Sequence, residues 1–135
     1  MKTSTILFYG GKIIISSAID TPDGEIKWGK PFIILNRDSG AGEIGGAIIK
    51  NLMSPIESVA SPAEILKETG FKSWDDFSSK NMMLSAELKG DKIVIHPYFS
   101  APGGEYYAVL NRDKESGLEP YELGHAVIKS LEYCG

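Results

Sequence analysis

The chain has 135 residues, of which 42% are hydrophobic and 24% charged, and its formal net charge is -4. This length predicts a single domain over residues 1–135 with a core that needs no disulfide or structural metal, and the composition excludes a disordered chain. Residues 61–135 hold 12 acidic and 8 basic side chains, which argues against a nucleic-acid-binding surface because phosphate contacts need Lys and Arg. An acidic surface suits a basic protein partner, or only solubility.

The N-terminal stretch MKTSTILFYGGKIII has too short an apolar run for a signal peptide, and no stretch reaches the roughly 18 apolar residues of a membrane helix. The one cysteine, Cys134, has no partner for an internal disulfide, which fits a reducing compartment. We therefore expect a cytoplasmic protein without a membrane segment.

The first half of the chain, about residues 3–54, is predicted to form a hairpin, a further strand and a helix. Gly10-Gly11 separates two β-rich runs, where a tight turn needs residues that tolerate positive φ. The strand PFIIL runs into LNRD, and apolar residues then recur at helical spacing from Ile44 to Leu52. Gly45 lies inside this helix, as Gly124 lies inside the matching helix of the second half, each at a cost of about 1 kcal/mol relative to alanine, so we expect another backbone close to them.

The middle of the chain is predicted to be a helical insert over about residues 61–79. Ser61 is a good N-cap, Pro62 suits the first helical position, and Glu64 completes a capping box before Gly70 ends the helix. The KSWDDF segment that follows contains a second Ser cap, for a short helix that presents its Trp and Phe to the core. The insert therefore contains one or two helices.

The second half, about residues 81–133, repeats the pattern of the first. Most matching segments have nearly the same offset, so that Gly10 matches Gly90 and Glu43 matches Glu122. LNRD recurs at a shorter offset and so requires a five-residue deletion in the second copy. An ordered series of matches predicts an internal duplication, with each LNRD at the exit from the sheet towards a helix. The matched segments are 9–15 with 89–95, 35–38 with 110–113, and 43–52 with 122–131.

The predicted fold class is therefore α+β. It consists of two internally duplicated units of antiparallel β-meander plus helix, with one or two helices between them. This arrangement is similar to duplicated folds of the Whirly type, a likeness that says nothing by itself about function.

Few residues suggest chemistry. GAGEIG (40–45) matches the G-x-G-x-x-G pattern of dinucleotide-binding loops, with Glu64 at the spacing of a ribose-binding acid, but Glu43 would crowd a pyrophosphate and the neighbouring strands read as antiparallel. His96 and His125 have no ligand-spaced neighbours, and Cys134 has no sequence link to a base. We predict no catalysis, no metal and no cofactor.

The two LNRD segments could bring two Asp carboxylates together for catalysis. At the end of a strand, however, Asn and Asp more often make turn hydrogen bonds, which is the favoured reading. Arg37 and Arg112 could form ion pairs with the neighbouring Asp, or with Glu43 and Glu122.

Two segments, GFKSWDDF (70–77) and ELGHAVIKSLEYC (122–134), resemble the immunity proteins of bacterial contact-dependent growth inhibition (CDI) systems. That family has a G-x-K-S-W-x-x-F signature and a later E-L-G-x-A helix. The residues that carry the match are Gly70, Lys72, Ser73, Trp74, Phe77, Glu122, Leu123, Gly124 and Ala126. The resemblance implies a cytoplasmic antitoxin that binds the C-terminal toxin domain delivered by a neighbouring cell, often a nuclease, and blocks its active site or substrate surface.

The residues of the family motif are expected to serve the fold, so they do not identify the surface that contacts the toxin. Acidic side chains would face a basic toxin around an aromatic anchor, and an exposed edge strand would add backbone pairing. Trp28 is the candidate anchor because it lies in the stretch that the second half lacks; alternatively, it folds against its own sheet. The expected contact residues are Asp20, Asp23, Glu25, Trp28, Asp75, Asp76 and Glu115.

The predicted function is therefore toxin neutralisation by protein binding, with no membrane or direct nucleic-acid contact. A single-stranded nucleic-acid-binding module is one alternative, because duplicated sheet folds include such modules. A small nucleotide-binding protein or enzyme, based on GAGEIG, is a weaker one.

Overall fold

The computed structural model describes residues 2–20, 26–70, 72–73, 81–100 and 106–134. The strands are β1 (Thr3–Tyr9), β2 (Lys12–Asp20), β3 (Ile26–Asn36), β4 (Ser58–Val59), β5 (Asn81–Lys89), β6 (Lys92–Ser100), β7 (Tyr106–Ala108) and β8 (Lys114–Ser116). The helices are α1 (Ala41–Met53), α2 (Pro62–Thr69) and α4 (Pro120–Ser130), and a 3-10 turn, η1 (Leu131–Tyr133), follows α4. The α+β class is confirmed.

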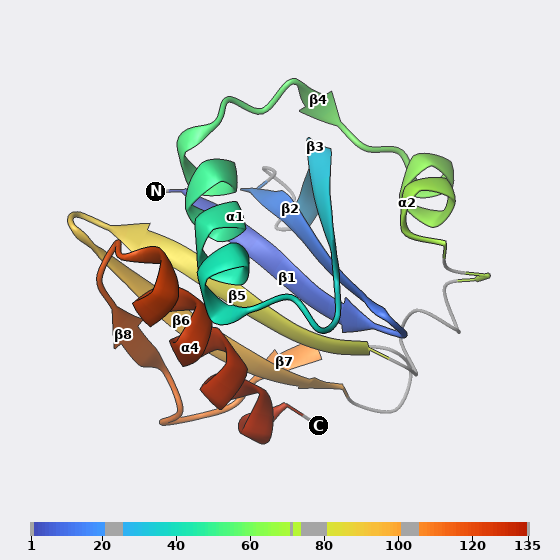
Figure 1. Cartoon of the computed structure of the whole chain (residues 1–135). Coiled ribbons are helices and arrows are strands. Elements are labelled where there is room, and N and C mark those ends of the chain that lie inside the picture. Colours follow the sequence, from blue (N-terminus) through green and yellow to red (C-terminus); the bar gives the residue numbers. More distant parts are fainter. Residues whose placement is uncertain (1, 21–25, 71, 74–80, 101–105, 135) are drawn as a thin grey trace.

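One antiparallel sheet runs through both halves of the chain (Figure 1). Seven of its strands follow the order β4-β3-β2-β1-β5-β6-β7, and β8 pairs with the other end of β6, at Ile93–Ile95. The two hairpins therefore meet at the centre of the sheet, where β1 pairs with β5.

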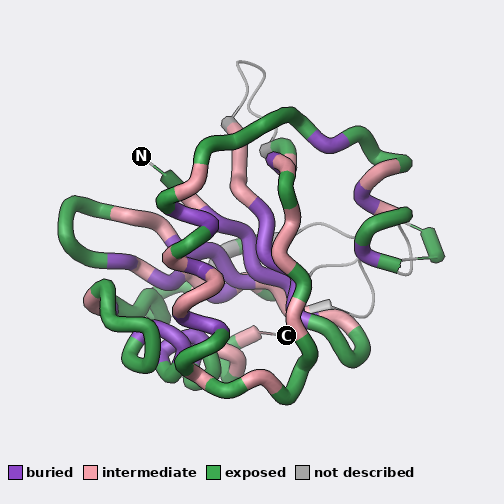
Figure 2. The backbone as a smooth tube through the Cα atoms, turned by 45° about the horizontal axis from the view of Figure 1, so that its top comes forward, coloured by how far each residue is buried: buried purple, intermediate pink, exposed green. Residues whose placement is uncertain are grey.

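The main core lies between the sheet and the helices α1 and α4, which lie side by side over one face (Figures 1 and 2). Strand residues of alternate positions point to this face, as the period of two requires. Each fully buried aliphatic side chain stabilises the fold by about 1.5–3 kcal/mol. The buried members are Ile6, Phe8, Ile13, Ile15, Ile44, Ile48, Leu52, Leu84, Ala86, Ile93, Ile95, Leu123, Ala126 and Val127.

Helices α1 and α4 approach each other through two glycines. A Cβ on Gly45 would overlap the carbonyl oxygen of Pro120, and a Cβ on Gly124 would overlap that of Ala41. The helical cost of each glycine is therefore offset by a close backbone contact. The expectation that another backbone lies close to Gly45 is confirmed.

The two hairpins have the same register at matching positions. Tyr9 pairs with Lys12 in the first hairpin, and Lys89 pairs with Lys92 in the second. The turn glycines Gly10 and Gly90 have φ of 58° and 64°. These positive φ values explain why glycine opens both turns.

The same correspondence appears across the centre of the sheet. In the β1–β5 ladder Thr5 pairs with Ser85, which is its equivalent when Gly10 is matched with Gly90. A pair of equivalent residues lies on a local twofold axis, so the two hairpins are related by an approximate rotation about this point.

The two LNRD segments occupy different places, and the prediction that both mark a strand-to-helix junction is wrong. The first closes β3, where Leu35 pairs with Ile13, and α1 follows. The second lies between β7 and β8, after which the chain returns to the sheet and Ser116 pairs with Ile93. Register follows the hydrophobic alternation and the turn, so a shared tetrapeptide does not impose a shared position.

The strand pairing also contradicts the five-residue deletion that was predicted for the second half. Trp28 pairs with Ala18, and Ala108 pairs with Tyr98, so the second pair is the equivalent of the first at the offset that the hairpins already have. Trp28 therefore has a counterpart in the second half. The internal duplication and the likeness to Whirly folds stay predictions.

Between the halves, α2 forms as its caps predict. The Glu64 N–H donates to Ser61 Oγ (3.2 Å), the Ser61 N–H donates to Glu64 Oε1 (3.1 Å), and Gly70 ends the helix with φ of 80°. The second predicted helix, with its Trp and Phe, falls on residues 74–80 and lies outside the described residues.

Helix α4 begins with an unusual cap. The Glu119 carboxylate accepts hydrogen bonds from the N–H groups of Tyr121 (3.1 Å) and Glu122 (2.6 Å). It thereby replaces the Ser or Thr that more often satisfies the first turn of a helix.

Candidate protein-interaction surface

The structure tests only part of the predicted acidic surface. Asp20 ends β2, where its backbone pairs with Ile26. Glu115 lies on β8 with its side chain 66% exposed, and its carboxylate is 3.7 Å from Nζ of Lys92, which is also exposed. Such a pair is worth little in water, so both charges are available to a partner. The other acidic residues of the predicted surface, Asp23, Glu25, Asp75 and Asp76, lie outside the described residues.

Trp28 lies on the sheet face opposite α1 and α4. It packs, half-buried, against a small second cluster formed by Leu7 and Ile14, and its ring meets that of Phe32 edge-on at 6.1 Å. Leu66 of α2 packs against the same cluster. Trp28 therefore folds against its own sheet, as the alternative interpretation has it. Its role as an anchor for a protein partner stays a prediction.

The GAGEIG segment is used for packing. Gly40 is the N-cap of α1, Glu43 is exposed in the first turn, and Gly45 is buried under α4. The Lys30 ammonium binds the Glu64 carboxylate, and this hydrogen bond, with that from the Ser61 N–H, holds the pKa of Glu64 below its usual value. Gly45 and Glu64 are thus engaged in structural contacts, and the strands before α1 pair antiparallel rather than forming the βαβ unit of a dinucleotide site.

Sequence reasoning missed a cluster on the second half of the sheet, formed by Glu87, His96 and Asp113. His96 Nδ1 lies 2.9 Å from Asp113 Oδ1, and His96 Nε2 lies 3.4 Å from Glu87 Oε1. The two ring nitrogens face different carboxylates, so an imidazolium would donate to both. Within the described residues, no three His, Cys, Asp or Glu side chains are placed to share a metal ion.

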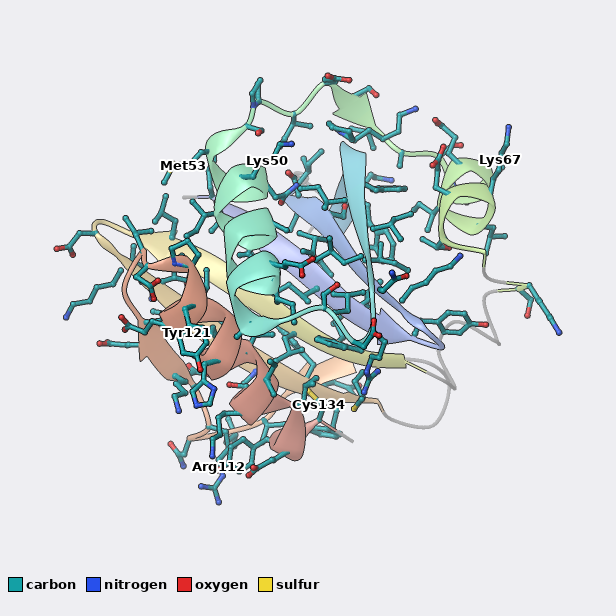
Figure 3. All side chains as sticks on the ribbon, in the orientation of Figure 1. Lys50, Met53, Lys67, Arg112, Tyr121 and Cys134 are labelled. Atoms are coloured by element: carbon teal, nitrogen blue, oxygen red, sulfur yellow. The ribbon has the colours of Figure 1, made fainter. Side chains whose placement is uncertain are left out.

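A pocket of about 430 Å³ opens beside this cluster, between the loop after β7 and the end of α4. We call it the Arg112 pocket. Its charged lining consists of three cations, Arg112, Lys114 and Lys129, and two acids, Asp113 and Glu132; Tyr133 supplies an aromatic wall. Figure 3 shows Arg112 at the C-terminal end of α4, on the side of the molecule where Cys134 lies.

The second LNRD segment supplies three of the eight residues that line this pocket. Asn111 has φ of 61°, a left-handed conformation that Asn adopts more readily than most residues. This turn separates β7 from β8 and leaves the next three side chains, Arg112 to Lys114, at the pocket.

The arginine ion pairs that the sequence allowed do not form within the described residues. Arg37 lies over the ring of Phe8 and Arg112 over that of Tyr133, each 4.8 Å from the ring centroid, and neither forms an ion pair within the part of the chain that the structure describes. An arginine plane gains from stacking on an aromatic face as well as from charge. Glu122, one partner that the sequence allowed, instead accepts a hydrogen bond from the Gly117 N–H (3.0 Å).

Cys134 is partly buried next to the sheet. Burial raises the pKa of its thiol, and Sγ donates a hydrogen bond to the Met83 carbonyl oxygen (3.5 Å). A thiol held in its neutral form is a poor nucleophile.

None of the helices in the described residues is long and apolar enough to cross a membrane.

Two solved structures are similar to this chain over almost its whole length. One is a protein of unknown function from Neisseria meningitidis, which is 16% identical with a TM-score of 0.79, over 99% of this chain and 95% of that one. The other is a chain of a CdiA-CT/CdiI toxin and immunity complex from Yersinia pseudotuberculosis, which is 11% identical with a TM-score of 0.74, over 99% of this chain and 97% of that one. No family profile and no curated protein matches the sequence. At these identities, the similarity shows a shared fold.

Proposed function

We propose that the chain is an immunity protein that binds and neutralises the C-terminal toxin domain of a contact-dependent growth inhibition system. The observation that carries the proposal is the similarity of the whole fold to one chain of a toxin and immunity complex. The sequence resemblance in residues 70–77 and 122–134 supports it independently. In that second segment Leu123, Gly124 and Ala126 are buried, as expected of residues that serve the fold.

The proposed mechanism is occlusion by binding, without catalysis, in the cytoplasm of the protected cell. The net charge of -4 suits a basic partner such as a nuclease, because complementary charge speeds association and disfavours wrong partners. Exposed acids such as Glu115 would meet the toxin first, and buried apolar contacts would then hold it.

We also infer that the two halves derive from one duplicated unit. Three features support this: hairpins in the same register, a central ladder in which Thr5 meets Ser85, and the exchange of glycine contacts between α1 and α4. A chain made of residues 81–134 that assembled as a twofold dimer with the same helix contact would be the direct test.

Co-expression tests the proposed function. A large secreted protein encoded immediately upstream of the gene would be the candidate toxin, and the chain is expressed with its C-terminal domain, and with an unrelated toxin domain as control. We expect growth to be rescued and the two proteins to co-purify only in the cognate pair. Failure of both rescue and co-purification, or retention of the chain on single-stranded DNA at physiological salt, would contradict the proposal.

A further inference from the structure

We propose that the Arg112 pocket receives the carboxylate of an acidic side chain from the protein partner. The identity of that partner as a toxin domain rests on the proposed function, whereas the chemistry of the pocket rests on its own geometry. The partner would thus contact this chain at two places, the predicted acidic surface and the positively charged Arg112 pocket.

The charge balance of the pocket differs from that of the whole chain. Three cations face it, and none of them forms an ion pair within the described residues. Two acids also line the pocket, Asp113, which lies 2.9 Å from His96 Nδ1, and Glu132, so three cations against two acids leave the lining with a formal charge of +1. The pocket is therefore cationic in a protein whose net charge is -4, and it attracts an anion.

The end of α4 does not cancel this attraction. A helix C-terminus carries about half a negative charge on its unpaired carbonyl groups. Here the Leu131 N–H bonds the carbonyl oxygens of Ile128 and Lys129, and the Cys134 N–H bonds that of Leu131 (3.1 Å). These hydrogen bonds engage several of the carbonyl groups at this end of the helix. Lys129, in the last turn, also places a positive charge there.

Arg112 is positioned for a carboxylate. Its guanidinium lies over the Tyr133 ring at 4.8 Å, which limits the orientations of the plane. A guanidinium that lies over a ring still has N–H groups along its edge, and two of them match the two oxygens of a carboxylate. Lys114 and Lys129 add point charges from the loop and from the helix.

The surroundings favour a protein side chain over a free small anion. Leu110, which directly precedes the lining residue Asn111 in the chain, is 83% exposed. Arg112 and Tyr133 in the pocket, with an exposed apolar side chain beside them in the chain, have the composition of an interface hot spot. A small free anion would leave Leu110 in water.

The first experiment uses the pocket alone. The 15N-labelled chain is titrated with N-acetyl-glutamate N-methylamide, and with the glutamine analogue as a matched neutral control. We expect saturable shifts at Arg112, Lys129 and Tyr133 with the glutamate compound only, at concentrations on the order of 1–10 mM, weakening with added salt. Equal responses to both compounds, or shifts that do not include these residues, would overturn the proposal.

The second experiment uses the toxin domain. Arg112→Glu and Lys129→Glu are combined, and Lys50→Glu and Lys67→Glu serve as controls because these exposed lysines lie on α1 and α2 (Figure 3). Lys50 is also the counterpart of Lys129 in the matched helix segments 43–52 and 122–131. We expect the double variant to bind about tenfold or more weakly, and the control variants to bind within about twofold of the parent chain.

The two proposals fail differently. If the parent chain binds the toxin domain and the double variant, folded by circular dichroism, binds equally well, the pocket proposal is overturned and the immunity function stands. If the parent chain binds no toxin domain, the immunity function fails, and the titration with the glutamate and glutamine compounds decides the chemistry of the pocket.

Discussion

The two halves of the chain share a hairpin and a helix but differ in the third strand. In the first half β3 is continuous over 11 residues, and β4 covers part of its edge through the pairing of Gly29 with Val59. In the second half the corresponding strand is split into β7 and β8, with 110–113 looped out between them. The interruption creates the Arg112 pocket and brings Asp113 to His96. The two halves thus have a similar hairpin and helix but different surfaces, because edge strands and loops tolerate changes of sequence and length that a packed core does not.

The largest effect is expected in the shared core. Ile13→Ala and Ile93→Ala remove equivalent, fully buried side chains, and each should lower the free energy of unfolding by about 4 kcal/mol. Urea unfolding measures both. Similar losses would support equivalent halves, and a difference above about 2 kcal/mol would show that the two sites differ in how they pack around the cavity. Ile34→Ala, at a site 41% exposed, is the control and should cost far less.

The helix contact should come next. Gly45→Ala and Gly124→Ala each force a methyl group into a backbone carbonyl, and we expect each to destabilise the fold by about 2–3 kcal/mol. Gly46→Ala is the matched control, because a Cβ there meets no atom within 4 Å. It should stabilise the fold by about 0.5–1 kcal/mol through helix propensity. Stabilisation by all three variants would disprove the close contact.

The helix caps should have a smaller and unequal effect. Glu119→Ala removes two hydrogen bonds from the first turn of α4 and should cost about 1 kcal/mol. Helix α1 has no side-chain cap at Gly40, so Gly40→Asp should gain about 0.3 kcal/mol. Thermal unfolding at neutral pH compares them. No loss in Glu119→Ala would show that water replaces the cap.

The smallest effect concerns the exposed ion pair that joins α2 to the first half. Because the Lys30 ammonium lowers the folded-state pKa of Glu64, the unfolded state binds more protons as pH falls below the usual carboxyl value of about 4.3. The stabilisation is therefore present at neutral pH and lost as pH falls through the folded-state pKa. Unfolding of Glu64→Gln from pH 7 to pH 3 should show a deficit relative to the parent chain that shrinks with acid and with salt. A stability deficit that does not change with pH would indicate that the variant loses its capping interaction with Ser61 rather than its ion pair with Lys30.

Much of the fold could be predicted because its signals are local. Gly10 and Gly90 mark turns that need positive φ, Ser61 and Glu64 cap one helix reciprocally, and the apolar spacing from Ile44 to Leu52 defines another. The glycines inside the helices even revealed a tertiary contact, since their cost required a reason.

The LNRD repeat misled because identity of letters is weaker evidence than strand register. Its second copy turns through Asn111 and rejoins the sheet as β8, which is three residues long and has no alternating apolar pattern to reveal it. The arginines likewise lie over the rings of Phe8 and Tyr133 rather than pairing with acids. These contacts could not be predicted, because the rings are distant from the arginines in the chain.

The sequence by itself determined the α+β class, the hairpins, the helices and the need for close contact at Gly45 and Gly124, because turn chemistry, capping and hydrophobic period act over a few residues. Only the tertiary structure decided which side chains share a surface. The Arg112 pocket and the His96 cluster each combine segments that lie apart in the chain, the loop after β7 with the end of α4 and β5 with β6. Their chemistry depends on distance and burial, which arise only when the two halves pack on one sheet.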